Sequence, residues 1–352
     1  MISRRIPKAF MVLLSVTLLI IAGLIAPTLA QAQAKPINLR LASPFPTGII
    51  FHEFTKDWIA KVKKDTGGRL EFQEYWAGTL VPAGDSYKEL TRGVADIVFL
   101  WIAVEKSGFD LDQAMPDFFY GARNPQTELR VYQDLWTMFP EIRSQYKDVK
   151  LLSMIYHPGF VIATKQPVRT LADLKGKRLR CIAGHVNALK ALGAEPVVMS
   201  NTDAYFAIQK GVLDGGVMPH ENLQTFKIAE ITKYYTECPL KHGVLGGLAI
   251  NLAAWNKLPP DIQKVLDDNV KWANERTLYW FTDVFNQKAV EFAKKQGGEF
   301  ITLPPEEEKK FDDLLQSVAL ERAATLDAKG LPGTRIFKEA RTLIQKYNKE
   351  AH

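Results

Sequence analysis

The sequence predicts an α/β fold with two domains, in which parallel or mixed sheets are covered by helices. Short apolar runs of strand length alternate along the chain with segments whose apolar residues recur at helical spacing, a pattern typical of such sheets. The chain has 352 residues, enough for two ordinary domains with full cores. No linker rich in Gly, Pro or Ser separates the domains, so we expect the chain to cross between them more than once.

The first 34 residues have the layout of a secretory signal peptide. Three basic residues precede an apolar run from Phe10 to Ala26, and small residues at 30, 32 and 34 offer cleavage sites. The alternative is a retained membrane anchor, but the run is shorter than the roughly 20 apolar residues that span a bilayer comfortably. An arginine pair near the start partly matches a twin-arginine signal, which leaves the export route open. We therefore expect a periplasmic protein.

In the N-terminal half of the mature chain, strands and helices alternate in short segments. Thr66-Gly67-Gly68 ends the first helix, because glycine commonly follows the last helical turn. The apolar run from Asp96 to Trp101 suits a strand that is buried on both faces. The expected strands cover 37–42, 69–76 and 96–101, and the expected helices cover 51–64 and 85–93.

The same alternation returns in the second half. The expected strands cover 151–156, 178–182, 195–199 and 215–218, and the expected helices cover 186–192 and 202–210. From Pro259 to about Lys295 the spacing is helical with few breakers, and proline fits the first turn of a helix. This stretch exceeds the usual length of roughly 8–20 residues. We therefore expect one long helix, or two in series, that could brace the two domains.

Composition argues against several classes of function. The leader holds three of the 45 basic residues and none of the 39 acidic ones, so the mature chain has a small net charge and no basic cluster suited to nucleic acid. No Cys/His cluster has metal-ligand spacing, so we predict no metal and no cofactor. Neither a Gly-x-Ser-x-Gly elbow nor an assignable carboxylate pair supports an enzyme. Cys181 and Cys238 are too few for a disulfide framework, and whether they pair stays open.

Short motifs spread over almost the whole mature chain point to a known family. They are Thr66-Gly67-Gly68-Arg69-Leu70, Gly93-Val94-Ala95-Asp96-Ile97, Leu171-Ala172-Asp173-Leu174-Lys175-Gly176-Lys177-Arg178-Leu179-Arg180, Ala191-Leu192-Gly193-Ala194, Gly211-Val212-Leu213-Asp214-Gly215, Phe226-Lys227, Glu230, Lys233-Tyr234, Ile250-Asn251 and Trp255-Asn256-Lys257-Leu258-Pro259. In order and spacing this series resembles the DctP-type substrate-binding proteins of TRAP transporters.

The resemblance implies a two-lobed fold like that of periplasmic binding proteins, which closes on its ligand as a hinged clamp, with the long C-terminal helix bridging the lobes. Lobe I would comprise residues 35–157 and about 247–287, and lobe II residues 158–246 and about 288–352. The resemblance also implies a protein that is not an enzyme but delivers an organic acid to membrane permease subunits. We expect a monomer, although the long helix could support a dimer.

The resemblance places a carboxylate-binding arginine at Arg180, at the end of a strand. A planar guanidinium can hold a carboxylate through two parallel hydrogen bonds, which lysine cannot imitate. The alternative for Arg180 is a structural salt bridge. Arg178, two residues earlier, shares its face on a regular strand, and we expect it on the surface.

The chain departs from the family pattern at two positions. Val161 stands where many members have a second arginine, and Met218 stands where many have an asparagine. Aromatic residues fall close to the predicted pocket instead; they are Trp101, Trp76, Tyr156, Phe45 and Phe51. We therefore expect one carboxylate held by Arg180 and an apolar remainder, as in an aromatic or hydrophobic monocarboxylate.

Two alternatives stay open at this point. A C4-dicarboxylate or keto acid would fit if Lys241, His242 or Asn187 supplied the missing polar contact, and His185 or His220 could do the same. The same fold could also report its ligand to a membrane sensor kinase instead of feeding a permease. The predicted ligand-binding residues are Arg180, Trp101, Trp76, Tyr156, Met218, Phe45, Asn187 and His242.

Overall fold

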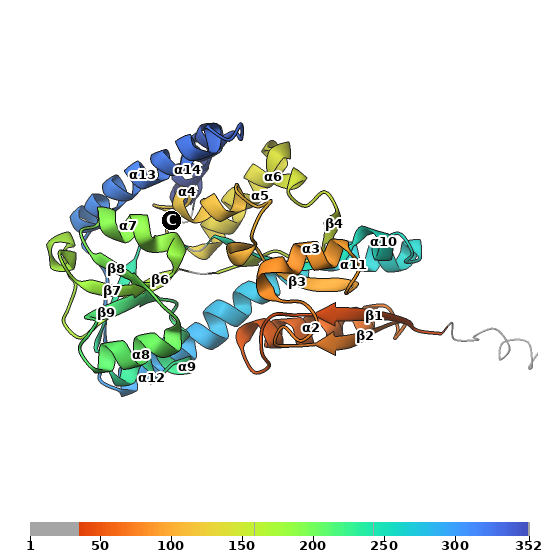
Figure 1. Ribbon diagram of the computed structural model, residues 1–352, viewed down its shortest axis with the longest axis horizontal. Coiled ribbons are helices and arrows are strands. Elements are labelled where there is room, and N and C mark those ends of the chain that lie inside the picture. Colours follow the sequence, from red (N-terminus) through yellow and green to blue (C-terminus); the bar gives the residue numbers. More distant parts are fainter. Residues whose placement is uncertain (1–34, 158, 242, 351–352) are drawn as a thin grey trace, which may run out of the picture.

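The computed structural model describes residues 35–350 except 158 and 242, so the predicted signal peptide lies outside the described residues. Two six-stranded sheets form the framework, and each mixes parallel with antiparallel pairs, which confirms the predicted α/β class (Figure 1). Within the described part of the chain, no helix is long and apolar enough to cross a membrane.

The first sheet, with its helices, is lobe I. Its strand order is β2-β1-β3-β11-β4, and β5 pairs with β11. The strands are β1 (Ile37–Ala42), β2 (Leu70–Tyr75), β3 (Ile97–Trp101), β4 (Val149–Leu151), β5 (Ile155–Tyr156) and β11 (Val244–Asn251). The helices are α2 (Ile50–Asp65), α3 (Ser86–Thr91), α10 (Leu252–Trp255) and α11 (Pro260–Tyr279). Leu41 packs with Trp58 of α2 in one core cluster, whereas Ala42 packs with Leu90 of α3 in another, so side chains that alternate along β1 serve both faces of the sheet.

The second sheet, with its helices, is lobe II. Its strand order is β12-β10-β6-β9-β7-β8. The strands are β6 (Phe160–Thr164), β7 (Arg178–Cys181), β8 (Glu195–Val198), β9 (Gly215–Met218), β10 (Tyr234–Cys238) and β12 (Glu299–Ile301). The helices on its faces are α7 (Val186–Ala191), α8 (Asn201–Gln209), α9 (Asn222–Thr225) and α12 (Gln287–Lys295). In Figure 1 α7 covers one face of this sheet, and α8, α9 and α12 cover the other. Cys181, near the end of β7, is buried and free.

A third group of helices extends the core of lobe II. It comprises α4 (Met115–Phe118), α5 (Pro125–Met138), α6 (Pro140–Ser144), α13 (Pro305–Asp327) and α14 (Gly333–Glu350). Leu135 of α5 and Leu343 of α14 belong to the same buried cluster as Leu179 of β7. The segment that carries α4 and α5 thus lies before residue 157 in the chain yet packs with lobe II, because its apolar faces meet α13 and α14.

The long helix expected from Pro259 to about Lys295 links the two lobes. α11 runs through a π-helical segment, Trp280–Asn286, directly into α12. Phe281 is buried in the lobe I cluster, whereas Ala289 is buried in a lobe II cluster. Figure 1 shows this helix crossing diagonally from one lobe to the other. Within residues 35–350, this helix and the connections β5–β6 and β10–β11 are the three places where the described chain passes between the sheets.

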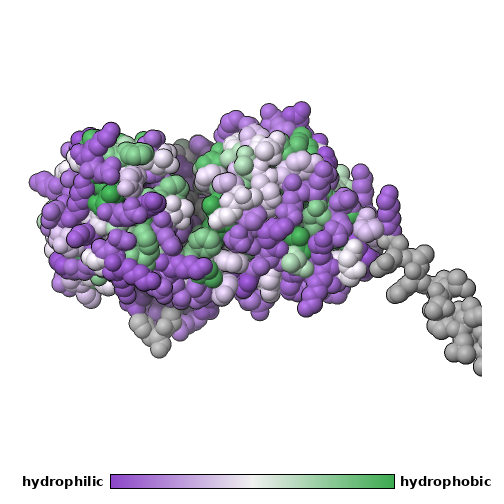
Figure 2. Space-filling view, turned by 90° about the horizontal axis from the view of Figure 1, so that it is seen from below, coloured by the Kyte–Doolittle hydropathy of each residue, from purple (hydrophilic) through white to green (hydrophobic). Residues whose placement is uncertain are grey.

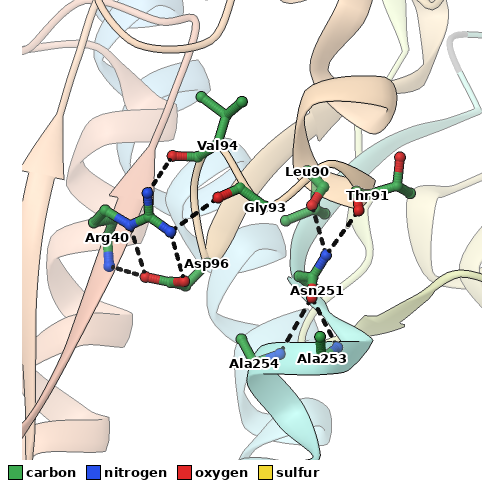
Figure 3. Close-up of polar contacts among 9 residues, drawn as sticks. All are labelled: Arg40, Leu90, Thr91, Gly93, Val94, Asp96, Asn251, Ala253 and Ala254. Carbon is green, nitrogen blue, oxygen red and sulfur yellow. Dashed lines mark hydrogen bonds and ion pairs between the residues drawn. The ribbon is translucent and has the colours of Figure 1, made fainter.

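A network of polar contacts fixes the corner of lobe I where the Gly93-Val94-Ala95-Asp96-Ile97 motif lies (Figure 3). The Arg40 guanidinium donates to Asp96 and to the carbonyls of Gly93 and Val94 at 2.8–3.1 Å. Burial opposes ionisation of Asp96, but the hydrogen bonds from Arg40 outweigh it, and the pKa of the carboxyl lies below its ordinary value. Asn251 caps α10 and also donates to two carbonyls at the end of α3.

The same backbone arrangement occurs in lobe II. The amide of Arg40 donates to Asp96 Oδ2 at 2.8 Å, and the amide of Arg178 donates to Asp214 Oδ2 at 2.8 Å. In return, the amides of Asp96 and Asp214 donate to the carbonyls of Arg40 and Arg178 at 3.0 Å. The aspartates of the two motifs therefore join neighbouring parallel strands in each lobe, a structural role.

Candidate functional site

A cavity of about 390 Å³ lies between the two lobes, at the carboxyl ends of β1, β3, β7 and β9. Ligands of open α/β sheets bind at such strand ends. Figure 2 shows the furrow between the lobes, with hydrophobic residues on both sides of it. The residues that line the cavity are Phe45, Pro46, Gly48, Ile49, Ile50, Phe51, Trp101, His157, Phe160, Arg180, Ile182, Asn201, Pro219, Glu221, Asn222, Thr225, Phe226 and Phe285.

Lobe I contributes an aromatic wall to this cavity. The rings of Phe45 and Phe51 stack with their centroids 4.1 Å apart and their planes at 25°. The indole of Trp101 lies 4.8 Å from the Phe45 ring. Phe45 is buried, and its amide donates to Ser43 Oγ at 3.3 Å, which helps to hold the loop between β1 and α2. These contacts hold the three rings of the wall against one another.

Lobe II contributes a buried guanidinium. Arg180 donates from Nε to the carbonyl of Met199 at 3.0 Å and from Nη1 to the carbonyl of Val217 at 3.2 Å. Only 5% of the residue is exposed, and no carboxylate of the described residues pairs with it. Burial lowers the pKa of Arg180 from its ordinary value. Two carbonyls thus fix the guanidinium while its charge stays uncompensated, which is the state that a ligand carboxylate would relieve.

Four further polar groups of the cavity are notable. The Nε2 atom of His157 lies 3.1 Å from Glu221 Oε1. Glu221 Oε2, Asn201 Oδ1 and Trp101 Nε1 are buried, and none of these three atoms has a hydrogen-bond partner among the described residues. Residues of the cavity lining thus carry one buried donor, on Trp101, and two buried acceptors without a partner among the described residues, in addition to Arg180.

A larger cavity, of about 630 Å³, has a different character. Its lining includes Glu128, Glu237, Glu308 and Asp312, and Lys241 of this lining is paired with Glu128 at 3.2 Å. Burial raises the pKa of Glu128 to about 7. Because acidic residues outnumber the basic ones here, this cavity is poorly suited to an organic acid.

The structure brings three of the predicted ligand-binding residues to the smaller cavity and places four others elsewhere. Arg180, Trp101 and Phe45 line it. The remaining described residues of the prediction, which do not line it, are Trp76, Tyr156, Met218 and Asn187. His242 lies outside the described residues.

Each of these four residues has a local reason for its position. The Trp76 indole donates to Glu74 at 3.1 Å, and its ring lies against His52. Tyr156 and Met218 are buried in the core clusters, and Asn187 is exposed on α7. Val161 pairs in register with Met218 and is buried in the same cluster, so neither departure from the family pattern faces this cavity.

Some cavity residues escaped the sequence analysis because distant segments supply them. His157 follows β5, Glu221 precedes α9, and Phe285 belongs to the π-helical segment. The signal for Glu221 was available: it lies three residues after the end of β9, and the carboxyl ends of strands are where ligands bind. Within the described residues, no group of three or more His, Cys, Asp and Glu side chains is placed to hold a metal ion.

Several known proteins with a similar sequence or fold are named as solute-binding proteins. The periplasmic protein DctP of Rhodobacter capsulatus, named as C4-dicarboxylate-binding, is 30% identical over 186 residues, 50% of this chain and 54% of that protein. The match thus spans about half the length of that relative. A TRAP periplasmic solute-binding protein from Desulfovibrio salexigens, solved as an open complex, is 28% identical with a TM-score of 0.80, over 88% of this chain and 96% of the other.

A second solved structure carries a ligand. It is a TRAP solute-binding protein from Rhodoferax ferrireducens in complex with benzoate, 25% identical with a TM-score of 0.74, over 90% of this chain and 100% of the other. These likenesses confirm the predicted two-lobed fold. Residues 43–325 match the family described as bacterial extracellular solute-binding protein, family 7, or DctP. Because this match covers most of the chain, the protein belongs to the DctP family of extracellular solute-binding proteins.

Proposed function

We propose that this protein is the extracytoplasmic receptor of a TRAP transporter, that it captures an aromatic or hydrophobic monocarboxylate, and that it delivers the acid unchanged to membrane permease subunits. One observation carries the proposal. Arg180 is a buried cation without a carboxylate partner among the described residues, and it shares its cavity with Phe45, Phe51 and Trp101. A ligand that complements both features has a single carboxylate and an apolar body.

The cavity suits such a ligand in size and in energetics. Its volume of about 390 Å³ falls within the roughly 300–1,000 Å³ typical of small-molecule sites. Hydrogen bonds to a charged partner contribute about 1.5–3 kcal/mol each. Contact between aromatic rings adds about 0.5–1.5 kcal/mol beyond the burial of area. The benzoate in the Rhodoferax ferrireducens relative is a ligand of this chemical class.

The relative named as C4-dicarboxylate-binding represents the main alternative ligand class. A C4-dicarboxylate has two charged ends and little apolar surface, so it would need a second cation at the other end of the cavity. Arg180 is the one lysine or arginine among the described residues of the lining. The alternative predicted from the sequence named Lys241, His242 or Asn187 for this contact, with His185 and His220 as further candidates. Lys241 is paired with Glu128 in the larger cavity, and Asn187, His185 and His220 do not line the smaller one. His242 lies outside the described residues.

A thermal-shift screen tests the proposal. The purified protein is heated with benzoate, phenylacetate, succinate or pyruvate, and a ligand that binds only the folded state raises the melting temperature. We expect the aromatic acids to stabilise the wild type and to have no effect on Arg180→Ala. Arg178→Ala is the matched control, since this arginine lies on the same strand but is exposed. Stabilisation by succinate alone would contradict the proposed ligand class, and no response to any acid would contradict the carboxylate site.

A further inference from the structure

Glu221 places a carboxylate in the same cavity as Arg180. It follows Pro219 and His220 after the end of β9, and α9 begins at the next residue. Its side chain is 14% exposed. Of the described residues that line the cavity, it is the one aspartate or glutamate. A negative group in a site for anions needs an explanation.

The two oxygens of Glu221 have different surroundings. Oε1 lies 3.1 Å from Nε2 of His157, whose ring packs between Phe160 and Phe281 at centroid distances of 5.8 and 4.5 Å. This contact holds the carboxylate in one orientation. Oε2 is buried and has no hydrogen-bond partner among the described residues. One oxygen is therefore used for positioning, and the other is a buried, unpaired acceptor on a residue of the cavity lining.

An unpartnered buried acceptor destabilises the protein unless another group donates to it. A ligand hydroxyl or ammonium group could donate to Glu221 Oε2 while the ligand carboxylate meets Arg180. A second ligand carboxylate at this place would face Glu221 as a like charge with little water between them. A methoxy group, which has no hydrogen to donate, would leave Oε2 unpaired.

We propose that Glu221 selects acids that carry a hydrogen-bond donor away from their carboxylate, and that it rejects acids with a second carboxylate. This inference rests on the proposed function, because it concerns the same cavity. A purely structural role is the alternative: the contact with His157 would then hold β9 and the residue after β5 together, and Oε2 would have no part in binding.

Isothermal titration calorimetry on the wild type and Glu221→Gln distinguishes these roles. The ligands are benzoate, 3- and 4-hydroxybenzoate, the corresponding methoxy and aminomethyl benzoates, and benzene-1,3-dicarboxylate. We expect the wild type to bind at least one donor-bearing acid about tenfold or more tightly than its methoxy counterpart, and not to bind the dicarboxylate. Comparing the dissociation constants of the hydroxybenzoates and the aminomethyl benzoates shows whether a hydroxyl or an ammonium donor is preferred. In Glu221→Gln the donor preference should fall below about threefold, and the dicarboxylate should bind.

The comparison uses ratios of dissociation constants within each protein, so a general change in affinity cancels. Glu237→Gln is the matched control, because Glu237 also contacts a histidine, His220, at 3.1 Å but does not line this cavity. If Glu221→Gln does not fold, Glu221→Asp replaces it: this variant should still reject the dicarboxylate but have a smaller donor preference. The inference would be overturned if the wild type bound hydroxy and methoxy acids equally, or if Glu221→Gln left the ratio of their dissociation constants unchanged. In either case, binding of benzoate by the wild type would still uphold the proposed function. If no aromatic acid binds the wild type, both fail.

Discussion

Replacing Arg180 by lysine separates the geometry of this residue from its charge. In the wild type, two nitrogens of the guanidinium are held by the carbonyls of Met199 and Val217 at 3.0 and 3.2 Å. The third nitrogen, Nη2, has no acceptor among the described residues. Lysine keeps the positive charge but carries it on one nitrogen, which has to serve the carbonyls and the ligand from a single point.

The expected loss of affinity follows from replacing three guanidinium nitrogens by the single nitrogen of lysine. At least one charge-assisted hydrogen bond of about 1.5–3 kcal/mol disappears in Arg180→Lys. Its dissociation constant for the bound acid should therefore rise roughly 10- to 150-fold. Arg180→Ala removes the charge as well and should cost about 2–5 kcal/mol, or roughly 30- to 5,000-fold.

Calorimetric titration with benzoate at constant ionic strength measures both effects. Arg178→Lys provides the control, since this exposed arginine lies two residues earlier on the same strand. We expect it to bind like the wild type. If Arg180→Lys bound benzoate within threefold of the wild type, charge alone would account for binding, and the reasoning from the two anchoring carbonyls would be wrong.

Three further predictions concern other parts of the molecule. Burial raises the pKa of Asp112 to about 6, so ionisation of this carboxyl lowers the stability of the fold as the pH rises from about 4 to 6. In urea unfolding, the difference in free energy of unfolding between wild type and Asp112→Asn should therefore shrink across that window. Above it, the difference should stay constant. Gly247→Ala should lower the free energy of unfolding by about 3 kcal/mol or more, because residue 247 has φ +151° and its new Cβ would lie 2.1 Å from the carbonyl oxygen of Ser153. At Gly48 a Cβ has room, so Gly48→Ala should lower it by only about 1–2 kcal/mol. Phe51→Ala should weaken benzoate binding about two- to tenfold in the same calorimetric assay through the lost ring contact, and unchanged affinity would exclude this side of the wall from the site.

Much of the fold could be predicted because its signals are local. The strand at Ile37–Ala42 and the helix beginning at Pro260 follow from alternation and from the position of proline. The expected strand over 151–156 is interrupted instead: Ser153 turns its hydroxyl to accept from the amide of Leu248, so the segment forms β4 and β5 separately. That interruption depends on a residue 95 positions away, which no local pattern shows.

The site was predictable only where a residue could be placed at the end of a strand. Arg180 and Trp101 follow that rule and line the cavity. Met218 also ends a strand and lies on the same face of the sheet as Arg180, but its side chain is buried in the cluster with Val161 and does not line the cavity. Glu221 lies three residues beyond the end of β9, so its place near a strand end was predictable, whereas the course of the turn that carries it was not.

The matching corners of the two lobes would give a direction to an acid bound as proposed. Arg40 and Arg178 hold equivalent positions, so the residues two places further along the strands, Ala42 and Arg180, are equivalent too. At these equivalent positions lobe I has the methyl group of Ala42, which is buried in its core, and lobe II has the guanidinium that lines the cavity. An acid bound as proposed would point its charged head at lobe II and its ring at lobe I. Lobe II alone would then recognise the anion, and lobe I would test the shape of what the anion is attached to.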